Sequence, residues 1–288
     1  MRILITIPHF FKPKDNSRHG SQRKDPQSRL EALSKSLAAL HQLFGKSQSI
    51  ININQRLAFP VNQPQAHELD IVICTTRDCH LLNQLSLPAH FYQHYPTQVE
   101  PLFLGFECQA ILRDCLEQYD YYCFLEDDLI LHDPWFFNKL SWFTKEAGDL
   151  CLLQPNRYEI STYALTCKAY VDGDLASRVT ERFQNVKERS QLQSNIMGVP
   201  ITFQRALNPH SGCYFLNANQ IAHWAQQSHF LDRDTSFVSP LESAATLGIM
   251  KTFLVYKSVP QQASFLEIQH YGTRFLDLIG EQVDLAIC

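Results

Sequence analysis

The chain has 288 residues, of which 45% are hydrophobic and 19% are charged, and it carries a formal net charge of -4 with a pI near 6.3. This length supports one large domain or two small ones, and the composition can supply a full core without disulfides or a structural metal. The slightly acidic balance gives no general reason to expect nucleic-acid binding, which requires a concentrated basic surface.

The cysteines and the apolar runs bear on the compartment. The nine cysteines are an odd set without a C-x-x-C spacing, and several lie inside apolar runs, so they are typical of buried thiols in a reducing compartment. The apolar N-terminal run ends at Pro8-His9 and is too short for a signal peptide, and no later run approaches the roughly 18–20 residues of a membrane span. We therefore expect a cytoplasmic protein without a transmembrane segment.

The first third of the chain alternates strand and helix signals. Residues 3–7 are apolar on both faces, which predicts a strand buried between helices. Asp25-Pro26 is a helix-start signal. It precedes apolar residues at helical spacing, namely Leu30, Leu33, Leu37, Leu40 and Phe44. Residues 50–53 and 70–74 predict further strands joined by a surface connection, so the sheet grows by β-α-β steps.

The rest of the chain continues the alternation. Cys108, Leu112, Cys115, Leu116 and Tyr119 mark the buried stripe of a second helix. We predict strands at residues 121–125, 150–153, 213–216 and 252–256, and helices from Asp133-Pro134, at 174–189, from about 218 and from Pro240. These elements predict an α/β fold, with a central, mostly parallel sheet flanked by helices in a single domain.

An acidic triplet, Glu126-Asp127-Asp128, follows the predicted buried strand 121–125. Ligands of open α/β sheets bind beyond the carboxyl ends of the strands, so the triplet lies where a site is expected. Adjacent carboxylates repel one another, and a hard divalent cation such as Mg²⁺ or Mn²⁺ would neutralise them. Side chains alternate along a strand, so Glu126 and Asp128 are expected to point one way and Asp127 the other. A solvated acidic turn is the alternative.

The segment Tyr119-Asp120-Tyr121-Tyr122-Cys123-Phe124-Leu125-Glu126-Asp127-Asp128, with Arg113 in the preceding helix, resembles the D-x-D region of GT-A-fold glycosyltransferases. The resemblance implies a GT-A-like fold, with residues 1–128 binding a nucleotide sugar and residues 129–288 binding the acceptor. It also implies Asp128 as a metal ligand and Glu126 as a contact to the metal or the donor ribose. Glutamate at the first position departs from the strict motif, which leaves Asp127 as an alternative partner.

Two later segments extend this resemblance. GT-A enzymes often carry an acidic element at a helix start, which Leu241-Glu242-Ser243 matches except that serine replaces the usual base. Glu242 is then the substitute base, with Asp232 and Asp234 behind it, or else a glutamate that stabilises the helix dipole. His270, within Ile268-Gln269-His270-Tyr271-Gly272, matches the histidine that completes the metal site, or else is a packed or exposed histidine.

Further segments correspond to the donor side of such enzymes. Pro8, His9 and Phe10 follow the first strand, where His9 and Phe10 could stack on a base. Arg18, Arg23 and Lys24 could reach phosphates or belong to a solvated loop. Thr76 and Arg77 follow another predicted strand. His210-Ser211-Gly212 would shape a sugar pocket or form an ordinary tight turn.

The resemblance implies a metal-dependent glycosyltransferase that moves a sugar from a nucleotide-diphosphate donor to a hydroxyl of a glycan or lipid-linked acceptor. Peripheral association with a membrane that carries the acceptor stays open. We favour inversion of the anomeric carbon, with an acidic base, over retention, which needs none. A nucleotidyltransferase is the rival enzyme, although residues 7–11 lack its glycine-rich loop and residues 20–24 are a faint echo of one. A non-catalytic GT-A-like module that binds a sugar or nucleotide is the other alternative.

Overall fold

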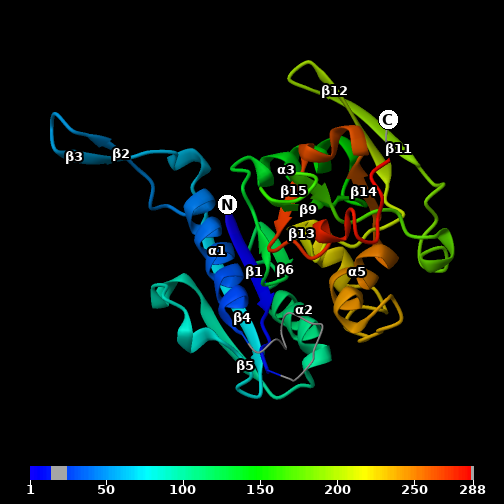
Figure 1. Ribbon diagram of the computed structural model, residues 1–288, viewed down its shortest axis with the longest axis horizontal. Helices are drawn as coiled ribbons and strands as arrows, with labels where there is room; N and C mark the ends of the chain where they lie inside the picture. The colour runs from blue at the N-terminus through cyan, green and yellow to red at the C-terminus, as the bar shows by residue number, and fades with distance from the viewer. Residues whose placement is uncertain (14–24, 287–288) are drawn as a thin grey trace. The chain divides into compact units, whose positions relative to one another are not determined.

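The computed structural model describes residues 1–13 and 25–286, and the chain divides into two compact units (Figure 1). Unit 1 consists of Met1–Asp127 and Phe215–Ala225, and unit 2 consists of Asp128–Tyr214 and Gln226–Cys288. The chain passes from one unit to the other inside the acidic triplet, between Asp127 and Asp128. Binding of the donor by the first half and of the acceptor by the second stays a prediction.

A five-stranded sheet organises unit 1. Its order is β13-β6-β1-β4-β5, and β1 is parallel to both β4 and β6, as β4 is to β5. Its strands are β1 (Arg2–Pro8), β4 (Glu68–Thr76), β5 (Gln93–Thr97), β6 (Tyr121–Leu125) and β13 (Cys213–Asn217), of which Phe215 onwards belongs to unit 1. Every residue of β6 is buried. The structure thus confirms the predicted α/β class, with a central sheet in which β6, β1, β4 and β5 are parallel.

Three helices cover this sheet, with α1 (Gln27–Phe44) packing on β4, α2 (Leu104–Asp114) on β1 and α4 (Ala218–Ala225) on β6. The Asp25 carboxylate accepts the Gln27 N–H at 2.9 Å at the start of α1, as its helix-start signal predicts. The predicted stripe of α1 is buried at Leu33, Leu37, Leu40 and Phe44. The helix predicted through residue 119 ends earlier, because Tyr122 holds residues 115–119 as a turn.

The hydroxyl of Tyr122 fixes that turn. Tyr122 is fully buried, and its hydroxyl donates to the Cys115 carbonyl at 2.9 Å. It also accepts the N–H groups of Gln118 and Tyr119 at 3.1 and 3.2 Å. One side chain on β6 therefore contacts three backbone groups of this turn, of which the Gln118 N–H and the Cys115 carbonyl also bond each other at 3.2 Å.

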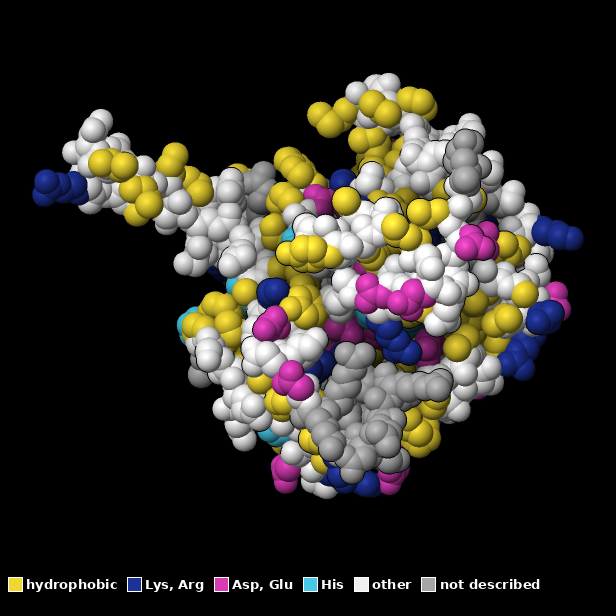
Figure 2. All heavy atoms as spheres, viewed as in Figure 1, with side chains coloured by type: hydrophobic (Ala, Val, Ile, Leu, Met, Phe, Trp, Pro, Cys, Tyr) yellow, Lys and Arg dark blue, Asp and Glu magenta, His cyan; other side chains and the backbone are white. Residues whose placement is uncertain are grey.

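The strand predicted at residues 50–53 exists, but it does not join the central sheet. β2 (Ser49–Asn52) pairs antiparallel with β3 (Leu57–Pro60) in a separate hairpin, which Figure 1 shows extending from the end of α1. Large apolar side chains are exposed along it, as Figure 2 shows, namely Ile50, Ile51, Ile53, Leu57 and Phe59. Its β-branched residues set the strand conformation without burying it in the sheet.

Unit 2 contains two four-stranded sheets. The first has the order β10-β9-β15-β7, with β15 parallel to β9 and antiparallel to β7. The second has the order β11-β12-β14-β8, with β14 parallel to β8. Their bounds are β7 (Leu129–Ile130), β8 (Cys151–Leu153), β9 (Asn156–Ile160), β10 (Lys168–Tyr170), β11 (Gln191–Ile196), β12 (Val199–Arg205), β14 (Leu254–Ser258) and β15 (Glu267–His270). The strand predicted at 252–256 begins two residues later than expected.

Two helices pack on the second sheet of unit 2. α3 (Phe136–Ala147) packs on β8, and α5 (Pro240–Thr252) packs on β14. Phe203 lies at the centre of an aromatic cluster, with its ring 5.0 Å from Phe143 and 5.5 Å from Phe265. Both helices begin near the prolines that predicted them.

The helix predicted at residues 174–189 is absent, and only the short 3-10 turn Ser177–Val179 forms there. The Arg205 guanidinium donates to the carbonyls of Asn185 and Glu188 at 3.1 and 2.9 Å. These carbonyls are thereby satisfied by a side chain from β12 instead of by helical N–H groups. A tertiary contact has overridden the local pattern.

Two further features bear on the cellular context. The eight cysteines within residues 1–286 are free, and Cys74, Cys108, Cys123, Cys151 and Cys213 are buried. In the part of the chain that the structure describes, no helix has both the length and the hydropathy needed to cross a bilayer.

Replacing Tyr122 with phenylalanine removes the hydroxyl and leaves a carbonyl and two N–H groups without that partner. We expect the free energy of unfolding to fall by about 1–3 kcal/mol, measured by urea denaturation. Tyr95→Phe on β5 is the control, because Tyr95 is 46% exposed and its loss should change stability little. Equal stability of both variants and the wild type would show that water replaces the Tyr122 hydroxyl.

Candidate functional site

Asp127, the middle residue of the triplet, pairs with two residues of unit 1. Asp127 is 1% exposed, its Oδ2 lies 2.5 Å from His9 Nδ1, and its Oδ1 pairs with Arg29 of α1. The other ring nitrogen of His9 accepts the Leu81 N–H at 3.1 Å, so Nδ1 carries the proton and donates to Asp127. His9 is fully buried, so a base cannot stack on its ring as it lies here. Asp127 therefore ties β1, α1 and the end of β6 together.

The other predicted donor-side residues of unit 1 make local contacts. The Thr76 hydroxyl donates to the Val99 carbonyl at 2.5 Å, and Arg77 pairs with Glu100 on the surface. Arg113 pairs with Asp114, the last residue of α2. Pro8, Phe10 and Glu126 are half-buried, and Arg18, Arg23 and Lys24 lie outside the described residues. Donor binding by these residues stays a prediction.

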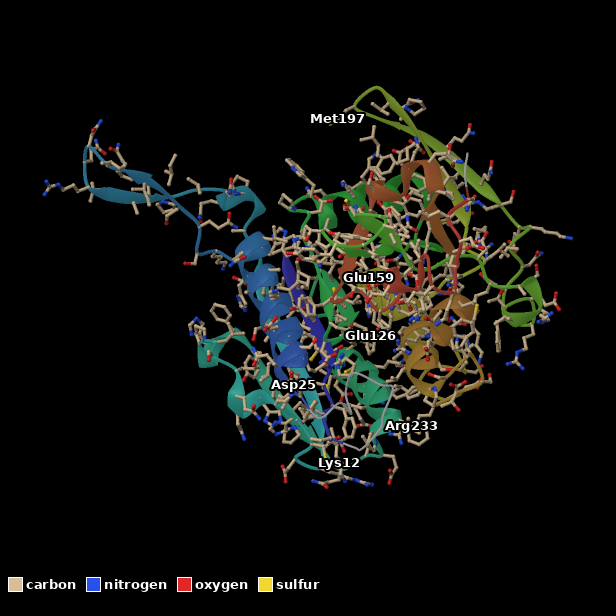
Figure 3. The ribbon with its side chains drawn as sticks, viewed as in Figure 1. Lys12, Asp25, Glu126, Glu159, Met197 and Arg233 are labelled. Atoms are coloured by element: carbon tan, nitrogen blue, oxygen red, sulfur yellow. The ribbon has the colours of Figure 1, made fainter. Side chains whose placement is uncertain are left out.

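In unit 2 the sheet register brings three side chains together. His270 of β15 pairs with Leu129 of β7, and the Tyr271 N–H donates to the Asp128 carbonyl at 2.8 Å, so Asp128 lies beside His270. On the other side, Gln269 pairs with Tyr158 of β9, which places Glu159 next to His270. Glu159 is labelled in Figure 3. Neighbouring strands thus assemble residues that are far apart in the sequence.

His270 contacts Glu159 more closely than it contacts Asp128. His270 Nδ1 lies 2.7 Å from Glu159 Oε1, a short hydrogen bond, whereas His270 Nε2 lies 3.8 Å from Asp128 Oδ2. The second separation exceeds a hydrogen bond. Adjacent ligands of one octahedral cation with bonds of about 2.1 Å lie about 3.0 Å apart, so the two side chains would have to move closer together to bind the same ion.

The charge state of His270 reflects opposing effects. Burial alone would lower the pKa of His270, but the hydrogen bond to Glu159 and the charge of Asp128 raise it above its ordinary value. The carboxylates of Glu159 and Asp128 therefore create a negative electrostatic potential at the ring. A cation at Nε2 would compete with a proton there, because histidine binds a metal only in its neutral form.

The residues that the structure describes form no complete metal site on their own. Within residues 1–13 and 25–286, no group of three or more His, Cys, Asp and Glu side chains gathers closely enough to hold a metal ion. Asp128 and His270 therefore offer two donors, and Glu126 as a third ligand stays a prediction. Mg²⁺ sites commonly use one or two carboxylates, with water and substrate phosphates filling the remaining positions.

The predicted base residues are also in unit 2. Glu242 lies in the first turn of α5 and accepts a hydrogen bond from Ser239, the residue that precedes the helix. Lys251 lies 2.8 Å from Asp234 and 3.5 Å from Asp232. The hydrogen bond from Lys251 lowers the pKa of Asp234 to about 2, which makes Asp234 a weak proton acceptor. Glu242 is the one of the three that lacks a lysine partner among these ion pairs.

A second buried charge cluster lies on β9 and β14. Arg157 binds Asp172 through Nε and a terminal nitrogen at 2.6–3.1 Å, and Lys257 lies 3.4 Å from the same carboxylate. Lys257 also donates to the His210 carbonyl at 2.8 Å, and His210 Nδ1 lies 2.9 Å from the Thr246 hydroxyl. This network holds the His210-Ser211-Gly212 turn in place.

Sequence reasoning missed Glu159, Arg29 and the Arg157–Asp172–Lys257 cluster. Arg157 and Glu159 alternate within one short strand, NRYEI, and charged residues at alternate buried positions are a signal of paired or ligating groups. Arg29 carried no such signal, because basic residues on helices are usually solvated.

No protein family and no curated protein matches the chain. Among solved structures, the chain is similar to a CMP:2-keto-3-deoxy-manno-octonic acid synthetase complexed with CTP, at 11% identity and a TM-score of 0.37, over 90% of this chain and 92% of that one. It is also similar to S. aureus TarS 1–349, both in complex with UDP-GlcNAc (10% identity, TM-score 0.40, 93% of this chain) and alone (8%, 0.43, 96%). It spans 58% and 62% of those two TarS chains, which is less than two thirds. The TM-scores of these three similarities all lie below 0.5.

His210 makes stability depend on pH. Burial, with the positive charges of Arg157 and Lys257, lowers the pKa of His210 to about 3 despite the opposing charge of Asp172. The unfolded chain takes up this proton near pH 6.5 and the native state does not until about pH 3, so the free energy of unfolding should fall as pH drops through this window.

The variant His210→Gln isolates this effect, because glutamine keeps a hydrogen-bonding group near Thr246 but does not titrate. Its unfolding free energy, measured by denaturant titration from pH 7 to pH 4, should fall less steeply than that of the wild type, by at most about 1.4 kcal/mol per pH unit. Parallel curves for the two proteins would show that His210 is protonated in the native state.

Proposed function

We propose that this chain is a metal-dependent glycosyltransferase that moves a sugar from a nucleotide-diphosphate donor to a hydroxyl of a glycan or lipid-linked acceptor. The observation that carries the proposal is the placement of His270 Nε2 3.8 Å from Asp128 Oδ2, with His270 Nδ1 bound to Glu159. The GT-A resemblance of the acidic triplet supplies the reaction class.

Mn²⁺ or Mg²⁺ held by Asp128 and His270 would neutralise the charge that develops on the departing diphosphate. Asp128 would contribute a carboxylate oxygen, which suits both Mg²⁺ and Mn²⁺, and His270 would contribute a neutral imidazole nitrogen. Both groups are partly exposed, at 20% and 14% of their side-chain areas, so ligand can reach them.

The acceptor hydroxyl also has to lose its proton during transfer. Glu242 is the candidate base for an inverting reaction, because its two rivals, Asp232 and Asp234, are held by Lys251. The Ser239 hydroxyl orients the Glu242 carboxylate at the start of α5. A cytoplasmic location and any peripheral membrane association belong to this proposal as predictions.

The metal role predicts that Asp128→Ala abolishes Mn²⁺-dependent binding of UDP or GDP and leaves the fold intact. Asp128 is partly exposed, so its removal should change the thermal midpoint little. Isothermal titration calorimetry with and without Mn²⁺ measures the affinity. Unchanged nucleotide affinity in this variant would contradict the assignment.

Asp127→Asn is the matched control from the adjacent position. It weakens the buried contacts to His9 and Arg29 and should lower the unfolding free energy by about 3 kcal/mol or more, as expected for removing one partner of a buried pair. Its Mn²⁺ affinity should stay close to that of the wild type. A folded Asp127→Asn protein that fails to bind Mn²⁺ would instead make Asp127 the ligand.

The base role predicts that Glu242→Gln lowers the rate of sugar transfer by about 100-fold or more while donor affinity is preserved, since general-base catalysis typically contributes this much. Asp234→Asn, measured in the same transfer assay, serves as the comparison and should retain most of the activity. Wild-type turnover by Glu242→Gln would exclude Glu242 as the base and favour retention of configuration.

A further inference from the structure

Glu159 is a carboxylate with no exposed surface, and it lies outside both the D-x-D-like triplet and the Glu242 region. Burying an ionised carboxylate is unfavourable unless hydrogen bonds satisfy its oxygens. Glu159 meets this requirement three times, through His270 Nδ1 at 2.7 Å and the N–H groups of Phe275 and Leu276 at 2.8 and 2.7 Å. Such a group is held in one place and one orientation.

The contact with Glu159 decides which nitrogen of His270 carries its proton. An ionised carboxylate only accepts hydrogen bonds, so His270 Nδ1 has to be the donor. In the neutral ring, Nε2 is then unprotonated, and its lone pair is available on the side where Asp128 Oδ2 lies, 3.8 Å away. The same ring in the other tautomer would present an N–H there and could not bind a cation.

The C-terminal segment holds Glu159 itself. Phe275 and Leu276 donate to Glu159 Oε2, Leu276 is fully buried, and the Phe275 ring lies 5.7 Å from the His270 ring. Just beyond, the Asp277 N–H donates to the Thr273 carbonyl at 2.8 Å and closes this segment as a turn. The turn therefore fixes the carboxylate, and the carboxylate fixes the ring.

We propose that Glu159 is the positioning residue of the metal site: together with the turn at residues 273–278, it locks His270 in the orientation and tautomer that present Nε2 to a divalent cation. The inference rests on the proposed function, because it assigns a role at the same site. Carboxylates that hydrogen-bond a ligating histidine typically affect metal affinity by about 10–100-fold.

The tautomer can be tested in the wild-type protein without metal. Long-range ¹H–¹⁵N correlation spectra of histidine-labelled protein, recorded above the pKa of His270 and assigned with His270→Gln, distinguish a protonated from an unprotonated ring nitrogen. We expect Nδ1 protonated and Nε2 unprotonated. An Nε2-protonated ring, or rapid exchange between the two forms, would overturn the proposal.

The second test changes the carboxylate. In Glu159→Gln one side of the side chain becomes an NH₂ group, so it cannot accept from both His270 and the two backbone N–H groups. Mn²⁺ affinity, measured by calorimetry on the folded variant, should fall by about 10–100-fold. Glu267→Gln is the matched control. Glu267 lies on β15, the strand of His270, but on the opposite face, where it binds Lys168 and Tyr170, and its loss should leave Mn²⁺ affinity unchanged.

The outcomes separate this inference from the proposed function. If the wild type binds no Mn²⁺, the metal site itself fails. If the wild type binds Mn²⁺ and Asp128→Ala does not, but Glu159→Gln binds as tightly as the wild type, the site stands and the role of Glu159 is excluded. If Glu159→Gln does not fold, the tautomer of the wild-type ring decides.

Discussion

Buried carboxylates with charged or hydrogen-bonding partners recur in this protein, at Asp127 in unit 1 and at Asp172 and Glu159 in unit 2. In unit 1, Asp127 pairs with His9 and Arg29, and these contacts join β1, α1 and the end of β6. In unit 2, Glu159 accepts hydrogen bonds from His270 and from two N–H groups of the turn at residues 273–278. In both cases the low polarity of the surroundings makes a missing partner costly, so these contacts are fixed.

Adjacent carboxylates thereby acquire different roles. Asp127 is buried and its charge is neutralised within the protein, whereas Asp128 is partly exposed beside an imidazole nitrogen. Glu126 is half-buried as well, so the two outer residues of the triplet are more exposed than the middle one, and the strand itself ends before the triplet, at Leu125. For the proposed cation, this difference makes Asp128 the candidate ligand in preference to Asp127.

Much of the fold followed from local patterns. The buried strands 3–7 and 121–125 and the stripe of α1 were predictable because each apolar period matches a single element. Residues 50–53 were predicted as a strand but placed in the wrong sheet, because strand propensity does not encode a pairing partner. Residues 174–189 were predicted as a helix, but Arg205, which is distant in the sequence, donates to the carbonyls of Asn185 and Glu188.

Only part of the candidate site could be predicted from the sequence. Asp128 and His270 lie in segments that resemble GT-A motifs. Glu159 and Arg29 reach their partners through strand register and helix packing, which cannot be read from the sequence. The most direct test of the metal site is a crystal grown with Mn²⁺ and UDP, with anomalous diffraction measured at the manganese edge. We expect one anomalous peak, bound by Asp128 Oδ2 and His270 Nε2. A manganese peak at Asp127, or none beside His270, would contradict it.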